Sequence, residues 1–148
     1  MEKSQKVVTY TDGGSRGNPG PAALGVAICD EKGVVVKTYG EALGVRTNNE
    51  AEYAAIVYAL KKLKQLYGKG ACAMMHVEMR MDSQLAVKQL SGEYKMESEK
   101  LFKFFIDVGN LKMDFASVIF KHVPREQNKV ADRMVNEALD NPKQSSLL

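Results

Sequence analysis

Two hydrophobic periodicities divide the chain. Up to about residue 40, short runs of β-branched and other apolar residues are separated by turn formers, which predicts strands over residues 7–11, 22–29 and 34–39. The connection 30–33 is short enough to make the last two strands an antiparallel hairpin. Residues 12–21 are rich in glycine and proline, so the first strand is expected to end at Asp12 and to lead into a loop.

From Asn49 the apolar period lengthens to about 3.6 residues, the spacing of an amphipathic helix. Ile56, Leu60 and Leu63 fall on one stripe of this helix, and Gly68 is expected to end it. The rest of the pattern predicts a strand over residues 74–81, helices over 83–90 and 96–111, a strand over 115–123 and a helix over 129–139.

This order of elements predicts an α/β fold. Right-handed crossovers place the fourth and fifth strands parallel to the first. We therefore expect a five-stranded mixed sheet, with three antiparallel strands followed by parallel ones, and helices on both faces. A length of 148 residues suits a single domain. Its core is expected over about residues 6–140, with a flexible tail over 141–148.

Composition narrows the classes of protein. The chain has 21 Lys and Arg against 18 Asp and Glu, a smaller basic excess than binding to nucleic acid by charge alone requires. A hydrophobic fraction of 45% argues against a disordered chain. No apolar stretch is long enough to cross a bilayer, and the first eight residues lack a signal-peptide block, so we expect a cytoplasmic protein without a membrane partner. Cys29 and Cys72 form no paired motif, which predicts reduced thiols.

Four acidic residues occur where a solvated charge is not expected. Asp12 and Asp82 each end a predicted strand. Glu52 lies one turn into an apolar helix, and Asp132 lies in the first turn of the last helix. The carboxyl ends of parallel strands and the helix starts that follow them share one edge of an α/β sheet, where ligands bind. We therefore expect Asp12 and Asp82 within reach of one ion.

Such a cluster of acids predicts a divalent metal site. Clustered carboxylates repel one another and raise each other's pKa until cations neutralise them. Oxygen ligands without cysteine or a histidine pair favour Mg²⁺ or Mn²⁺ over zinc. Two such ions about 4 Å apart hold an attacking water and the leaving oxygen of a phosphodiester in line.

Each acid also has a purely structural interpretation. Asp12 would be a turn former, Asp82 an N-cap, and Asp132 a first-turn acid that the helix dipole favours. Glu52 would be the N3 residue of a capping box whose N-cap is Asn49. Spacing alone leaves both kinds of interpretation open.

Four segments resemble the motifs of type 1 ribonuclease H in order and in separation. They are residues 10–21 (YTDGGSRGNPGP), 47–53 (TNNEAEY), 82–84 (DSQ) and 122–132 (HVPREQNKVAD). The resemblance covers nearly the whole chain and implies the ribonuclease H fold, whose element order is the one derived above. Residues 92–95 (GEYK) resemble the archaeal-type branch of the family, which also occurs in bacteria.

The resemblance implies an endonuclease that hydrolyses the RNA strand of RNA·DNA hybrids with two Mg²⁺ ions, or Mn²⁺ in their place, and leaves 5′-phosphate and 3′-hydroxyl ends. His122 falls where the family keeps a mobile histidine that assists proton transfer or product release. We expect a monomer without an obligate protein partner. The catalytic, metal-binding acids that the resemblance implies are Asp12, Glu52, Asp82 and Asp132.

Selecting the RNA strand requires contacts to 2′-hydroxyls in a wide, shallow minor groove, which favours small residues and amides. By resemblance, Asn18, Asn49 and Gln84 contact 2′-hydroxyls, while other residues approach the backbone or the partner strand. As alternatives, the Asn18 segment is an ordinary turn and Asn49 an ordinary helix start. The residues expected to contact the hybrid are Gly13, Gly14, Ser15, Asn18, Thr47, Asn48, Asn49 and Gln84.

The chain departs from the family pattern in two places. The arginine that helps to bind a DNA phosphate commonly lies one position before Arg46, where this chain has Val45. The basic, Trp-rich protrusion that follows the Asp82 helix in many bacterial relatives is replaced by a short segment with acidic residues. We therefore expect the protein to bind the RNA·DNA hybrid weakly and with a strong dependence on salt concentration. The lysines at 61, 62 and 64 are expected to form a solvated helix face.

Other function classes compete with an active enzyme. The chain could be a catalytically weak relative that binds hybrid or double-stranded RNA, or an interaction module that kept only the fold. A scaffold has no physical reason to keep four repelling acids, which argues against the module. Integrase-like transferases with the same fold are disfavoured because the amides of this chain suit 2′-hydroxyls.

Overall fold

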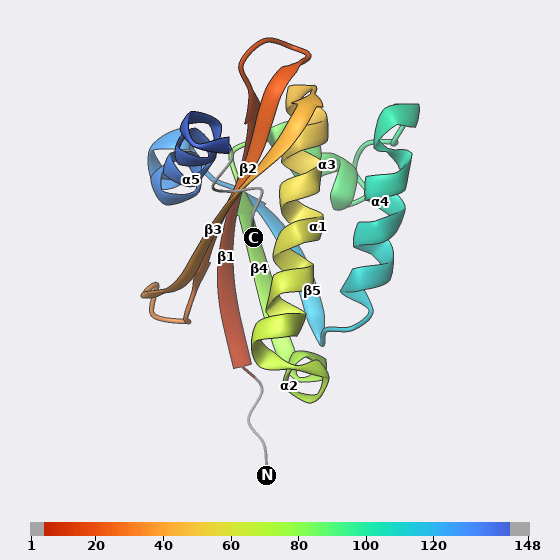
Figure 1. Ribbon diagram of the computed structural model, residues 1–148. Helices are drawn as coiled ribbons and strands as arrows, with labels where there is room; N and C mark the ends of the chain where they lie inside the picture. Colours follow the sequence, from red (N-terminus) through yellow and green to blue (C-terminus); the bar gives the residue numbers. More distant parts are fainter. Residues whose placement is uncertain (1–4, 143–148) are drawn as a thin grey trace.

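The computed structural model describes residues 5–142 and places a five-stranded sheet between helices on both faces (Figure 1). The strand order is β3-β2-β1-β4-β5. β2 pairs antiparallel with β1 and with β3, whereas β4 pairs parallel with β1 and with β5. The expected mixed sheet is therefore confirmed. Its strands are β1 (Gln5–Ser15), β2 (Gly20–Cys29), β3 (Val35–Arg46), β4 (Met75–Met81) and β5 (Ser117–His122).

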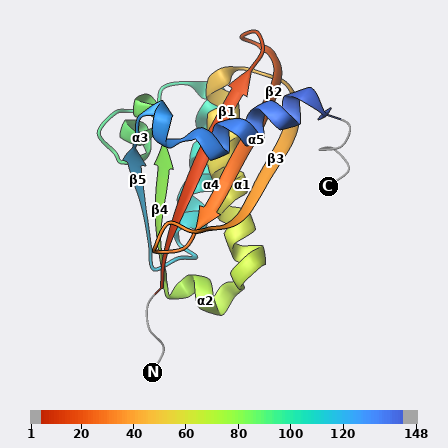
Figure 2. The same ribbon diagram turned by 90° about the vertical axis from the view of Figure 1, so that its left-hand side faces the viewer.

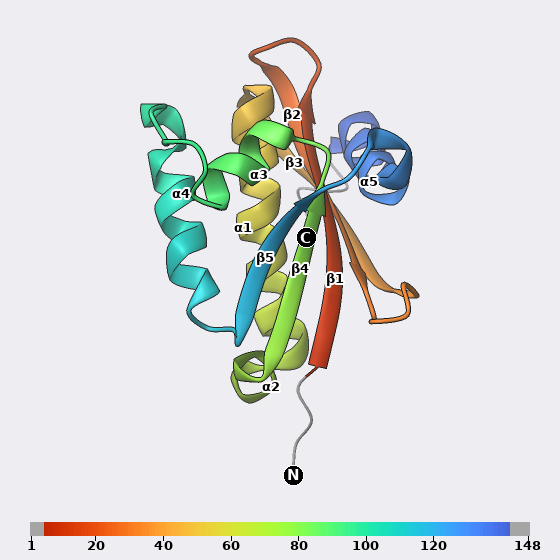
Figure 3. The same cartoon turned by 180° about the vertical axis from the view of Figure 1, so that it is seen from behind.

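The helices form two layers. α1 packs on β1 and β2, α4 packs on α1, and α5 packs on β1, β2 and β3. Figures 2 and 3 show that α5 crosses the face of the sheet opposite to α1, α3 and α4. The helical elements are α1 (Asn48–Tyr67), α2 (Lys69–Ala73), α3 (Gln84–Leu90), α4 (Glu99–Lys112), the 3-10 turn η1 (Arg125–Gln127) and α5 (Lys129–Asp140).

The larger hydrophobic core lies between the sheet and α1. Val7, Val77 and Met79 point from alternate positions of two strands toward Ile56 and Leu60 of α1, and all five are almost fully buried. A smaller cluster under α5 contains Ala23, Val135 and Ala138. The expected reduced thiols are present as two free, buried cysteines, Cys29 and Cys72.

β1 differs from its sequence prediction in a way that matters for function. The prediction that the strand ends at Asp12 is wrong, because the antiparallel ladder continues to Ser15 and places Asp12 opposite Gly25 of β2. The residues opposite this extension, from Ala22 to Gly25, are small except for Leu24, and the two strands keep pairing through the glycines of β1. Asp12 is therefore held by a hydrogen-bonded strand and not by a loop.

Other element boundaries also differ from the prediction. β3 continues to Arg46, and α4 begins at Glu99 instead of residue 96. Gly68, with φ +85°, ends α1 as expected, but it is followed directly by the short helix α2, which the pattern did not predict. Of the predicted tail, residues 143–148 lie outside the described residues. Within the described range, no helix is both long and apolar enough to cross a membrane.

Candidate active site

Four separate elements bring the four acids to one edge of the sheet. Asp12 lies in β1, and Asp82 directly follows β4, its parallel neighbour. Glu52 lies on α1 above one face, and Asp132 lies in the first turn of α5 on the other. All four residues are half-buried. All four acids selected from the sequence therefore lie at the edge of the sheet where the parallel strands end, as predicted.

Two glycines let the helices approach this edge closely. A Cβ at Gly13 would overlap the backbone of Ala51 and Glu52, so α1 contacts β1 directly beside Asp12. A Cβ at Gly25 would overlap the carbonyl oxygen of Ala131, the residue before Asp132. Glycine at both positions sets the depth at which the two helix-borne acids lie over the sheet.

The helix ends decide between the structural and functional interpretations of two acids. The capping box of α1 is formed by Thr47 and Glu50, with Glu50 N donating to Thr47 Oγ1 at 3.1 Å and Thr47 N to Glu50 Oε1 at 3.0 Å. The assignment of Glu52 to a capping box with Asn49 is therefore wrong. Ser83, not Asp82, is the N-cap of α3. Neither Glu52 nor Asp82 caps a helix, whereas Asp132 does lie in a first turn.

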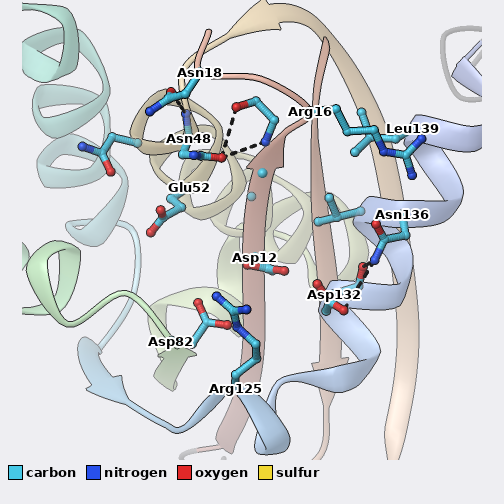
Figure 4. A pocket seen from close by; sticks show the side chains of 15 residues that line it. Asp12, Arg16, Asn18, Asn48, Glu52, Asp82, Arg125, Asp132, Asn136 and Leu139 are labelled. Atoms are coloured by element: carbon cyan, nitrogen blue, oxygen red, sulfur yellow. Dashed lines mark hydrogen bonds between the residues drawn. The ribbon is translucent and has the colours of Figure 1, made fainter. Parts of the chain in front are cut away.

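The acids line one pocket of about 500 Å³. Figure 4 shows Asp12 in the middle, Glu52 on the α1 side, Asp132 on the α5 side and Asp82 below. The lining is mostly polar and open to solvent on one side, and it includes the backbone of Gly13 and Gly14. A chain of phosphates and sugars fits such a surface better than an apolar ligand does.

The carboxylates in this pocket repel one another. Burial raises the pKa of Asp12 to about 8, and the nearby charges of Asp82 and Asp132, with a hydrogen bond to Asp132, add to this effect. Burial also raises the pKa of Glu52, with a further contribution from Asp82, although a hydrogen bond with Ser83 opposes the increase. The folded protein therefore concentrates negative charge that a bound cation would stabilise.

The donor set fits Mg²⁺ or Mn²⁺. It consists of carboxylate oxygens from four elements, without cysteine or histidine, and hard divalent cations prefer such ligands. Among residues 5–142, no three acidic, histidine or cysteine side chains already converge on one point as a finished metal centre. The residues that could hold ions are therefore present at one pocket, and their side chains would have to turn toward a bound cation.

A network of amides connects the glycine-rich strand end to the start of α1. Ser15 N and Oγ donate to Asn48 Oδ1 at 2.9 and 3.1 Å, and Asn48 N donates to Asn18 Oδ1 at 3.0 Å. These bonds use the amide oxygens of Asn18 and Asn48. The amide NH₂ groups of both side chains remain as donors for a ligand in the pocket, which Asn49 also lines.

Three residues expected at the site do not line this pocket: Thr47, Gln84 and His122. Thr47 is engaged in the capping box, and Gln84 is exposed at the start of α3. His122 ends β5 and is exposed. Arg46, one position after the place of the family's phosphate-binding arginine, pairs with Glu50 at 3.4 Å. The structure thus groups the four acids with the glycine and asparagine residues, and leaves these side chains outside.

Sequence reasoning missed three polar residues that line the pocket, Arg16, Arg125 and Asn136. Arg125 lies in η1, and Figure 4 places its guanidinium between Asp82 and Asp132. Asn136 Nδ2 donates to the backbone oxygen of Asp132 at 3.2 Å. Arg16 and Arg125 belong to two of the segments that carry the resemblance, so a cation within a motif segment was the signal that could have found them. Asn136 lies one helical turn after Asp132, on the same face of α5.

Comparisons with known proteins agree with this geometry. The model of a family described as reverse transcriptase-like matches residues 10–138. A ribonuclease HI of Halobacterium salinarum is 37% identical over 139 residues, which are 94% of this chain and 67% of that protein. A bifunctional protein of Mycobacterium tuberculosis is also 37% identical, over 95% of this chain, but the chain spans only 37% of its length.

Solved structures extend the similarity to three dimensions. LC11-RNase H1, isolated from compost, superposes with a TM-score of 0.87 at 45% identity and covers 93% of this chain and 98% of its own. RNase H1 of Halobacterium salinarum gives 0.84 at 38% identity, over 92% and 98%. LC11-RNase H1 has also been solved in complex with an RNA/DNA hybrid, with a TM-score of 0.87 to this chain at 44% identity, over 92% and 98%. Sequence, fold and the placement of the four acids together identify this chain as a member of the type 1 ribonuclease H family.

Proposed function

We propose that this protein is an endonuclease that hydrolyses the RNA strand of RNA·DNA hybrids and leaves 5′-phosphate and 3′-hydroxyl ends. The observation that carries the proposal is the convergence of Asp12, Glu52, Asp82 and Asp132 from four elements on one pocket, directly beside a glycine and amide surface. The hybrid bound to LC11-RNase H1 supports the choice of substrate.

Each group of residues has a part in this reaction. The four acids would hold two Mg²⁺ ions, with Mn²⁺ able to replace them. When bound, such ions lower the pKa of the attacking water and stabilise the leaving 3′ oxygen. Gly13 and Gly14 let the sugar-phosphate backbone approach the strand closely. The NH₂ groups of Asn18, Asn48 and Asn49 donate to minor-groove acceptors, including 2′-hydroxyls of the RNA strand.

Three proposed residues act from the edge of this site. Thr47 keeps a hydroxyl hydrogen for a phosphate of the partner strand, because its oxygen accepts within the capping box. Gln84 and His122 are exposed next to Ser83 and Val123 and would reach the substrate only once it is bound. We further propose that the protein works as a monomeric single domain in the cytoplasm, as the sequence predicts.

The proposal is tested with a labelled RNA·DNA hybrid, incubated with Mg²⁺, with Mn²⁺ or with EDTA, beside double-stranded RNA and double-stranded DNA. Cleavage of the RNA strand of the hybrid in the presence of metal, and its loss in EDTA, is expected. Binding of hybrid or double-stranded RNA without cleavage would instead favour the catalytically weak alternative. Equal cleavage of all three duplexes would contradict selection by 2′-hydroxyls on one strand.

Asp82→Asn gives a sharper test of the acid assignment. Removing one of the repelling charges should leave the metal-free protein folded and at least as stable as the wild type, while activity falls more than about a hundredfold. Glu31→Gln, in the exposed turn between β2 and β3, is the matched control and should cleave normally. Wild-type activity in Asp82→Asn would show that the acids are not the catalytic centre.

A further inference from the structure

Arg16 lines the pocket, and no part of the proposed function uses it. Figure 4 shows it beside Leu139 and Asn136 on the α5 side of the acids, whereas Asn18, Asn48 and Glu52 lie on the α1 side. Arg16 follows Asp12 by four residues at the end of the same extended segment. At roughly 3.3 Å per residue, its Cα lies about 13 Å from that of Asp12.

The backbone of Arg16 is held firmly in place. Its N–H donates to the carbonyl oxygen of Pro21 at 2.8 Å. Gly17 adopts φ +101°, and a Cβ at Gly20 would overlap the Arg16 carbonyl, so two glycines permit the tight loop. The side chain, in contrast, is 51% exposed. The loop therefore presents a long cationic side chain from a fixed base.

Within residues 5–142, the Arg16 guanidinium forms one ion pair, from Nη2 to Asp140 Oδ1 at 2.8 Å. Asp140 is the last residue of α5 and is 61% exposed. The helix dipole opposes a carboxylate at that end, and exposed pairs of this kind contribute little to stability. Asp140 can thus release the guanidinium at small cost, because water solvates the freed carboxylate.

We propose that Arg16 binds a phosphate of the RNA strand a few nucleotides from the scissile bond, and that Asp140 competes with that phosphate for the guanidinium. The proposal rests on the proposed function, since it needs the hybrid to lie across the acids. A phosphate offers two oxygens to the planar guanidinium and makes stronger, charge-assisted hydrogen bonds than one exposed carboxylate oxygen. Asp140 holds the Arg16 guanidinium near the path of the RNA backbone, and the phosphate replaces Asp140 when the hybrid binds.

Two variants distinguish this role from that of a structural clip between the loop and α5. Arg16→Ala should raise KM for the hybrid about tenfold and reduce the slope of log affinity against log salt by about one. Asp140→Asn should change KM in the opposite direction and lower it a few-fold, because the guanidinium is no longer shared. Arg16→Lys should fall between wild type and Arg16→Ala. If the ion pair is only a structural clip, Arg16→Ala and Asp140→Asn should both weaken binding of the hybrid and lower Tm to a similar extent. That outcome would overturn the proposal.

The contacted phosphate is located with hybrids that carry one uncharged methylphosphonate linkage, moved along each strand in turn. One linkage in the RNA strand should raise KM for the wild type but not for Arg16→Ala. The assignment would be overturned if only linkages in the DNA strand, or no linkage in either strand, changed KM for the wild type and not for Arg16→Ala. If the wild type cleaves no hybrid, the proposed function fails. If it cleaves but KM is unchanged in Arg16→Ala, only the role of Arg16 fails.

Discussion

Glu50 and Glu52 lie two residues apart on α1, yet their carboxylates are in opposite physical situations. A hydrogen bond from the backbone N–H of Thr47 lowers the pKa of Glu50, and Arg46 adds to this effect. Glu52 points about 200° further round the helix, toward the sheet, where burial raises its pKa. Glu50 stabilises the start of the helix as an anion, whereas at Glu52 burial outweighs the hydrogen bond with Ser83, and Glu52 is the acid suited to bind a cation.

Arg125 and His122 compete for the cationic role beside the acids. The guanidinium of Arg125 lines the pocket and offers a planar set of donors, while His122 is exposed outside it. Arg125→Ala should therefore lower kcat/KM by about ten- to a hundredfold, and His122→Ala by less than about threefold. Arg125→Lys should retain part of the activity. A larger loss in His122→Ala than in Arg125→Ala would show that the histidine has the larger part in the reaction, as the family resemblance implies.

At the scale of elements, glycines control how closely the helices approach the sheet. In Gly25→Ala, the new methyl group would overlap the Ala131 carbonyl and crowd the backbone of Val135, so the first turns of α5 must move outward. We expect a loss of about 1–3 kcal/mol in the free energy of unfolding, measured by urea denaturation. Activity should fall as well, because Asp132 moves with Ala131.

Gly14→Ala is the matched control for stability, since its Cβ would lie 3.8 Å from Val135 Cγ1, an ordinary contact. It places the same methyl group on the neighbouring strand beneath the same helix. The unfolding free energy of Gly14→Ala should therefore stay close to that of the wild type. Equal destabilisation by both substitutions would show that the close approach of α5 to Gly25 does not limit stability.

The element order and the edge that carries the acids could be predicted from the sequence, because apolar periodicity and crossover handedness determine them. The continuation of β1 to Ser15 could not be predicted, since it depends on pairing with β2 and not on its own glycines. The N-cap at Thr47 was missed for a similar reason. Thr47, Asn48 and Asn49 are all good N-caps, and tertiary contacts of Asn48 with Ser15 and Asn18 decide among them.

For the whole molecule, a net charge of +3 hides an uneven distribution of charge. Four acids share one pocket, and the cations Arg16 and Arg125 line the same pocket. The acids repel a phosphodiester substrate, whereas the two arginines attract it. Bound cations would remove the repulsion at the centre, so binding of metal and binding of substrate should favour each other.

Burial of Asp12 and repulsion among the acids should also make the stability of the metal-free protein depend on pH. The pKa of Asp12 is about 8 in the folded state against 3.8 for the unperturbed group, so the folded state binds the extra proton between about pH 4 and pH 8. Stability from this group is therefore present at low pH and is lost as pH rises through that window. Asp12→Asn has no such proton, and its Tm should change less over the same range.

Magnesium should have the opposite pH dependence, because it binds the deprotonated carboxylates. Ten millimolar MgCl₂, on the order of a typical excess over a weak site, should raise Tm more at pH 8.5 than at pH 5.5, and should have little effect on Asp12→Asn. The measurement is thermal unfolding followed by circular dichroism, with and without EDTA, at matched ionic strength. An equal increase in Tm at both pH values would show that the ion binds elsewhere, since at pH 5.5 it must displace the proton shared around Asp12.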